Sequence, residues 1–90
     1  MRITKAIIKN KEMQINLTLS SYGYNVKVRV EWAYGRPRAY LYNRDSEDQE
    51  REISPRLPTG EMYRWLNAYY QGLCLGLLKD EDLYKEKGRE

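Results

Sequence analysis

The chain has 90 residues, of which 41% are hydrophobic and 32% charged, with a net charge of +3 and no histidine. This length favours one domain, residues 1–90, and no apolar run approaches the roughly 18 residues that a membrane span needs. Without histidine, the commonest general base and metal ligand is missing, so we expect no enzyme, no metal site and no cofactor.

Charge and cysteine content point to a compartment and to partners. Cys74 is the only cysteine, which excludes an intramolecular disulfide and favours an intracellular, cytoplasmic protein without a secretory signal. Residues 1–44 hold nine Lys/Arg against two acids, whereas residues 45–90 hold seven against eleven. The first part is therefore basic and the rest acidic, an asymmetry that concerns partners rather than fold.

Short runs in the basic part alternate apolar and polar side chains, as half-buried strands do. The clearest runs carry leucines and valines on one face, and Asn and Gly residues between the runs suit tight turns, one of them at Asn10-Lys11. The pattern predicts four strands, at Arg2–Lys9, Met13–Ser20, Tyr24–Trp32 and Arg38–Asn43.

The second half changes to a helical period. Asp45–Glu52 has five acids and no apolar residue, so we expect a solvated loop, and the prolines extend residues 53–58, with Ile53 and Leu57 against an edge of the core. Thr59 is the expected N-cap of an amphipathic helix over residues 59–87, continuous or broken near residues 79–80. The predicted fold is α+β: a four-stranded antiparallel meander followed by one long C-terminal helix on one sheet face.

One helix covers only one side of such a sheet, so its other side is expected to face solvent or a ligand. Cations that offset phosphate charge and rings that stack bases are what a single-stranded nucleic acid requires. The alternative is that the basic and aromatic side chains on this side of the sheet are the ordinary side chains of solvated strands. The candidate binding residues are Lys27, Arg29, Arg36 and Arg38, with Tyr34, Tyr40 and Tyr42 as rings.

Two other features favour protein partners. Ala68, Gly72 and Gly76 form a row of small residues on the predicted helix, which allows close approach either to the sheet or to a second copy in a homodimer. The acids of Asp45–Glu52 lack the pattern of a calcium loop, so a solvated segment is the better interpretation. A protein-interaction module acting through the acidic loop and the helix, such as an accessory subunit or a small inhibitor, is the alternative function.

The predicted β-β-β-β-α order over most of residues 1–78, with its basic aromatic sheet, resembles the single-stranded-DNA-binding domains of the transcriptional positive-coactivator, Whirly and Pur families. This resemblance implies a homodimer that binds single-stranded DNA. No stretch of the sequence carries a motif of these families, so no binding residue is transferred.

Overall fold

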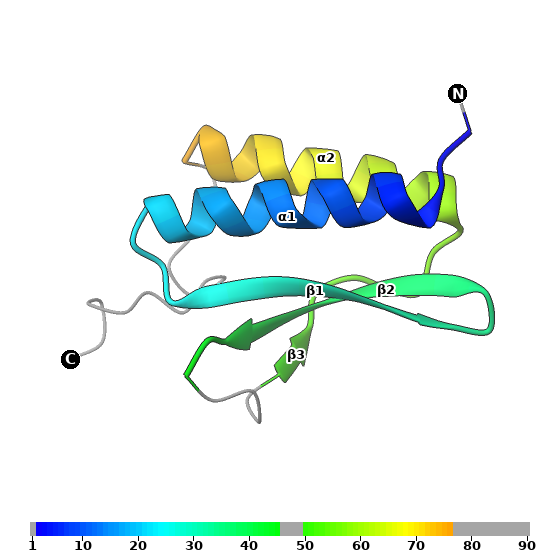
Figure 1. The fold of residues 1–90 in the computed structure, drawn as a ribbon, viewed down its shortest axis with the longest axis horizontal. Helices are drawn as coiled ribbons and strands as arrows, with labels where there is room; N and C mark the ends of the chain where they lie inside the picture. The colour runs from blue at the N-terminus through cyan, green and yellow to red at the C-terminus, as the bar shows by residue number, and fades with distance from the viewer. Residues whose placement is uncertain (1, 46–49, 77–90) are drawn as a thin grey trace.

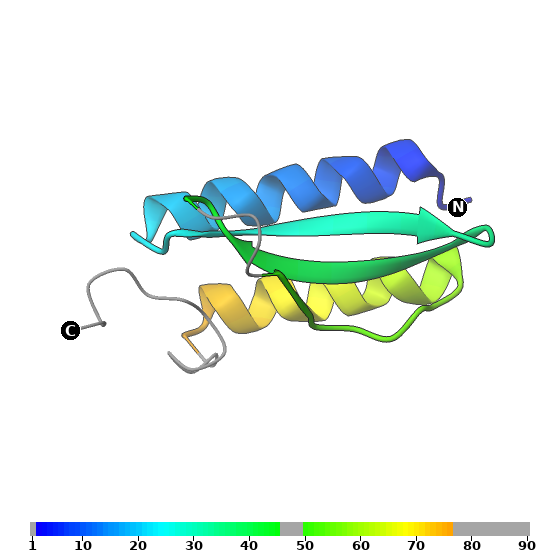
Figure 2. The same cartoon turned by 90° about the horizontal axis from the view of Figure 1, so that it is seen from below.

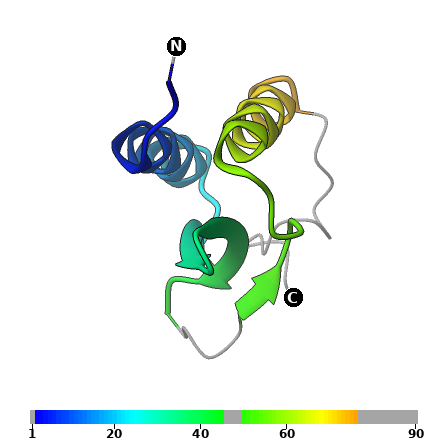
Figure 3. The same ribbon diagram turned by 90° about the vertical axis from the view of Figure 1, so that its right-hand side faces the viewer.

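The structure, a computed structural model, describes residues 2–45 and 50–76. Its three strands form one antiparallel sheet in the order β1-β2-β3, and both of its helices lie side by side over one face of that sheet (Figures 1 and 3). The α+β class is confirmed, but three strands and two helices replace the predicted four strands and one long helix. The elements in chain order are α1 (Lys5–Ser21), β1 (Val26–Ala33), β2 (Arg36–Asn43), β3 (Glu50–Glu52) and α2 (Thr59–Cys74).

The first two predicted strands and their Asn10-Lys11 turn are wrong, because residues 5–21 form α1. Thr4 is the N-cap, and its Oγ1 accepts a hydrogen bond from the Ile7 N–H at 3.3 Å. The apparent strand alternation came from Met13 and Leu17, whose side chains are 53% and 72% exposed. The side chains that α1 buries recur at the helical spacing of three or four residues: Ile8, Glu12, Ile15 and Leu19.

Polar side chains of α1 cover the outer edge of β1. Asn16 donates from Nδ2 to the Val28 carbonyl at 3.0 Å, and its Oδ1 accepts from the Val28 N–H at 2.7 Å. One turn earlier, a Glu12 carboxylate oxygen accepts from the Val30 N–H at 2.9 Å. These bonds replace those of a neighbouring strand, so this edge of the sheet is not open to pairing.

β1 and β2 are confirmed near their predicted positions and form a hairpin. Ala33 pairs with Arg36 across a two-residue turn of Tyr34 and Gly35, which have φ angles of 55° and 75°. Two successive positive φ angles define the type I′ turn, whose twist suits a tight hairpin. The turn therefore precedes Arg36 and Pro37, which already belong to β2.

The predicted solvated loop at residues 45–52 is partly wrong, because Glu50–Glu52 pairs with β2 as β3; residues 46–49 lie outside the described part. The extended segment that follows is confirmed. The Ile53 N–H donates to the Ala39 carbonyl and the Leu57 N–H to the Pro37 carbonyl, both at 3.0 Å. Ile53 and Leu57 pack against the core, so this segment closes the second edge of β2.

The core lies between the two helices and the sheet. In α2 the predicted apolar stripe is confirmed: Met62, Leu66 and Leu73 are buried, and Trp65 stacks on Tyr69 with ring centroids 5.3 Å apart. Residues from both helices and both long strands fill this space, namely Ile8, Ile15, Leu19, Val26, Val28, Ala39, Leu41, Met62, Leu66 and Leu73.

Both ends of α2 differ from the prediction. Pro58, not Thr59, is the N-cap and makes no side-chain capping bond. The helix ends at Cys74. Two residues later, Gly76 adopts a φ of 72°, and the Gly76 N–H donates to the Leu73 carbonyl. A left-handed glycine just past the last turn is a common helix stop. The predicted extension to residue 87, and the break near residues 79–80, fall beyond the described residues.

The two helices run in the same direction, and both begin at the end of the molecule that carries the β1–β2 turn (Figures 1 and 2). The observed α-β-β-β-α order also removes the basis of the resemblance, which depended on four strands before a single helix. None of the described helices is long and apolar enough to cross a membrane.

Candidate functional site

The helix-free face of the sheet carries five of the seven residues predicted to bind nucleic acid. The β1–β2 register places Lys27 opposite Tyr42 and Arg29 opposite Tyr40. Side chains alternate across a strand, so these side chains point away from the helices while Val28 and Leu41 between them are buried in the core. This placement is as predicted for Lys27, Arg29, Arg38, Tyr40 and Tyr42.

Acidic side chains neutralise the two arginines at the centre of this face. Arg29 Nη2 lies 2.8 Å from a Glu50 carboxylate oxygen, and Arg29 Nε lies 2.9 Å from Glu31. Arg38 Nη1 lies 2.7 Å from Glu52. These two arginines are therefore neutralised, which weakens their attraction for phosphates. Lys27, and Arg36 at the tip end of the same face, have no ion pair to a described acid.

The aromatic rings of the helix-free face are used within the fold. Tyr42 is only 6% exposed, and the Arg29 guanidinium carbon lies 4.6 Å from the centre of its ring. The hydrogen bond to Glu50 raises the pKa of Arg29 above its usual value, so this cation stays charged over the ring. Tyr40 is half-buried. The Tyr42 ring is therefore covered by a neighbouring side chain and is not a free platform for a base.

The other two predicted residues, Tyr34 and Arg36, lie at the hairpin tip. Tyr34 is 97% exposed, and Arg36 is exposed without an ion pair to any described acid. Arg56 donates from Nη1 to the Arg36 carbonyl at 2.9 Å, which brings a second guanidinium near the tip. The tip is therefore basic, and its two arginines have no ion pair to a described acid.

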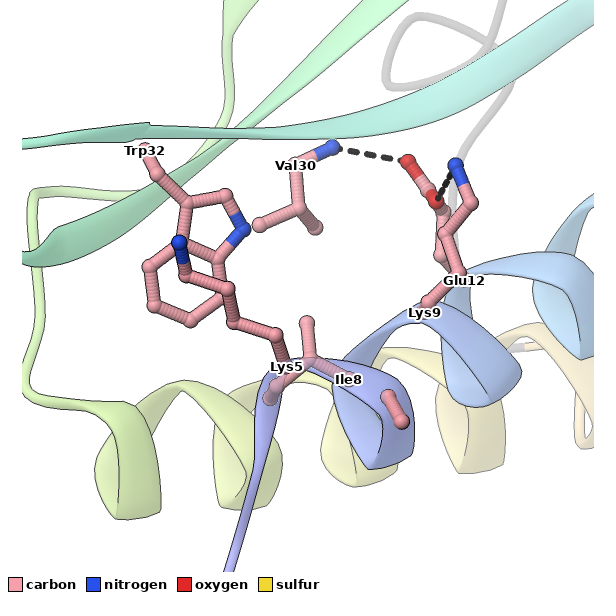
Figure 4. Close-up of a pocket in the computed structure, with 7 residues that line it drawn as sticks. Lys5, Ile8, Lys9, Glu12, Val30 and Trp32 are labelled. Carbon is pink, nitrogen blue, oxygen red and sulfur yellow. Dashed lines mark hydrogen bonds and ion pairs between the residues drawn. The ribbon is translucent and has the colours of Figure 1, made fainter.

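Between α1 and β1, two adjoining depressions of about 360 and 410 Å³ share Lys5 and Trp32 in their walls; we call them together the α1–β1 groove. The first is shown in Figure 4 and extends along α1 past Lys9 and Glu12. The second lies toward the hairpin tip and is lined by Arg2, Ile3, Thr4, Lys5, Trp32, Gly35 and Thr59.

The groove is positively charged. Arg2, Lys5 and Lys9 line it, and Glu12 is the only acid in its walls among the residues that the structure describes. Glu12 is 7% exposed, accepts from the Val30 N–H and lies 3.4 Å from Lys9 Nζ, so its charge is largely used inside the fold. No described carboxylate lies within 4.0 Å of a side-chain nitrogen of Arg2 or Lys5.

Local structure explains how the groove is built. Lys5 and Lys9 are one turn apart on α1, and Lys5 Nζ lies 5.0 Å from the centre of the Trp32 ring at the end of β1. The second depression is bounded by Thr4, the N-cap of α1, and by Thr59, the first residue of α2. The N–H groups of two helix starts therefore add partial positive charge to that of the side chains.

Sequence reasoning missed the groove because it placed Lys5 and Lys9 on a strand. A usable signal was present: Thr4 is a good N-cap, and Ile8, Ile15 and Leu19 follow it at helical spacing. That signal would have put both lysines on one side of a helix.

Residues predicted to mediate a dimer are not all on one helix. Ala68 is exposed and Gly72 half-buried on α2, whereas Gly76 lies beyond the helix end. A homodimer through this side of α2 stays a prediction. In the described ranges, no group of three or more Cys, Asp or Glu side chains is arranged to hold a metal ion.

No family model, curated protein or solved structure matches this chain. Function is therefore inferred from the α1–β1 groove, the hairpin tip and the helix-free face. The groove and the hairpin tip each place cations beside an aromatic ring, which suits an anionic ligand that also has flat groups. On the helix-free face, Arg29 and Arg38 are already in ion pairs and the Tyr42 ring is covered by Arg29.

Proposed function

We propose that the protein is a small non-enzymatic domain that binds nucleic acid at the α1–β1 groove and the adjoining hairpin tip. Phosphates lie against Arg2, Lys5 and Lys9, and Arg36 extends the positive surface along the tip. The observation that carries the proposal is the charge of the groove, where three cations line two depressions beside a single buried acid.

The location differs from the one expected from sequence because the groove keeps a surplus of positive charge, even though Lys9 lies 3.4 Å from Glu12. Arg29 and Arg38 have carboxylates at 2.7–2.9 Å, and binding a phosphate there would require breaking those ion pairs. At Lys5 the charge faces an indole ring instead. Cations of such a groove displace condensed counterions when they bind phosphates, and this displacement makes affinity depend on salt.

The test is the binding of a short fluorescent oligonucleotide, followed by anisotropy at several salt concentrations. We expect affinity to fall steeply between about 50 and 200 mM salt. The double variant Lys5→Gln/Lys9→Gln should bind more weakly. Its slope of log K against log salt should be smaller by about 0.7 for each phosphate of a single strand that the variant no longer neutralises.

Arg64→Gln is the matched control, because Arg64 is an exposed cation on α2 that lines neither depression. It removes charge without touching the groove, so its salt slope should equal that of the wild type. Affinity that is absent, independent of salt, or lowered equally by Arg64→Gln and by the groove variant would refute the proposal.

A second candidate function is a protein-interaction module, favoured by exposed apolar side chains on α1. Met13 and Leu17 lie one turn apart beside a depression of about 340 Å³ whose rim includes Lys27 and Arg44. Apolar contacts with a basic rim suit an acidic amphipathic helix of a partner. We expect such a partner to co-purify after nuclease treatment and to be lost in Leu17→Glu but retained in Leu75→Glu; equal retention by both variants excludes this surface.

A further inference from the structure

Tyr34 occupies a position that a tyrosine disfavours. It is the first turn residue of the β1–β2 hairpin, and its φ of 55° lies in the left-handed region. Glycine and asparagine adopt this conformation readily, whereas a large side chain adopts it at a cost in conformational energy. Of the residues described, it is the only one other than glycine with a positive φ.

The ring of Tyr34 makes no contact with the described residues that would stabilise the fold and offset this conformational cost. It is 97% exposed, so it buries almost no apolar surface, and it makes no hydrogen bond within the described structure. A residue that strains the backbone and contributes no packing has its benefit outside the fold. An isolated exposed ring is also well suited to contact a flat partner.

The tip adjoins the α1–β1 groove. Gly35, the second turn residue, lines the same depression as Arg2 and Lys5, and Arg36 follows it with an exposed side chain. A chain of phosphates held at the groove therefore reaches the hairpin turn that carries Tyr34. Bases of a single strand are free to leave the backbone and stack on such a ring, whereas paired bases of a duplex are not.

We propose that Tyr34 is a stacking platform for an unpaired base, and that it makes the site selective for single-stranded nucleic acid. This inference rests on the proposed function of the groove. The phosphate contacts provide affinity without regard to strandedness, and the hairpin tip provides the preference for unpaired bases.

The test is Tyr34→Asn, which has opposite effects on folding and binding. Asparagine accepts a positive φ, so the variant should unfold at a temperature a few degrees higher than the wild type. Its affinity for a single-stranded oligonucleotide should fall about 5- to 100-fold, and its affinity for a duplex of the same sequence should stay unchanged. A merely structural role would not produce a more stable protein that binds more weakly.

Tyr34→Phe is the matched control, since it keeps the ring and removes the hydroxyl. Its affinity should equal that of the wild type, and a 2-aminopurine base in the oligonucleotide should be quenched by both proteins but not by Tyr34→Asn. Unchanged single-strand affinity in Tyr34→Asn, together with weak binding by Lys5→Gln/Lys9→Gln, overturns the stacking platform and leaves the groove. Unchanged affinity in all variants, or no binding by the wild type, removes both.

Discussion

Replacing Asn16 with leucine should lower the free energy of unfolding by about 2–4 kcal/mol, because it leaves the N–H and the carbonyl of Val28 without partners. Leucine has the same branched skeleton as asparagine and favours helices more, so the destabilisation reports chiefly the loss of the two hydrogen bonds at 2.7 and 3.0 Å. The measurement is urea denaturation followed by far-ultraviolet circular dichroism.

Asn10→Leu is the control for this substitution. Asn10 is an exposed residue of the same helix, so the change brings the gain in helix propensity without affecting β1. Its stability should match or slightly exceed that of the wild type. The Asn16 variant should also associate at high concentration in light scattering, because the uncovered edge of β1 becomes available for pairing. Equal stability of the two variants would show that Asn16 does not support the edge.

Leu66→Ala should destabilise the protein by about 2–5 kcal/mol, since Leu66 is fully buried where α2 meets the sheet and α1. Proteins of this kind have a total stability of about 5–15 kcal/mol, so the variant loses a large part of it. Thermal unfolding followed by near-ultraviolet circular dichroism, which reports the packing of the tryptophans and tyrosines, gives the change directly.

Leu75→Ala provides the comparison, because Leu75 is 71% exposed at the end of α2. The same chemical change there should alter stability by no more than about 0.5 kcal/mol. A similar destabilisation at both positions would mean that Leu66 does not lie in the core.

The parts of the fold that sequence predicts well are those whose buried residues are all apolar. The valines of β1 alternate without interruption, and Met62, Leu66 and Leu73 mark α2. In α1 the buried stripe includes Glu12, while the apolar Met13 and Leu17 face solvent. Because a polar residue is buried and two apolar residues are exposed, the helical period of α1 is hidden in the sequence. The polar residues of α1 bind to β1, and interactions between residues distant in sequence leave no local pattern.

The surroundings of the candidate binding residues also depend on interactions between distant parts of the chain. Alternation was enough to place Arg29 and Arg38 on the helix-free face, but not to reveal their partners. Glu50 and Glu52 reach them only because β3 pairs with β2 in one particular register. A run of acids without an apolar residue gives no sign of a strand, so the ion pairs of Arg29 and Arg38 become visible only with the tertiary structure.

The shared direction of α1 and α2 gives the molecule an electrical polarity along its length. Peptide dipoles in both helices add rather than cancel, with their positive ends together beside the hairpin. A molecule polarised in this way turns in the field of an approaching anion before the two touch. Association with an anionic partner is therefore oriented from the first encounter, with the end that holds Tyr34 arriving foremost.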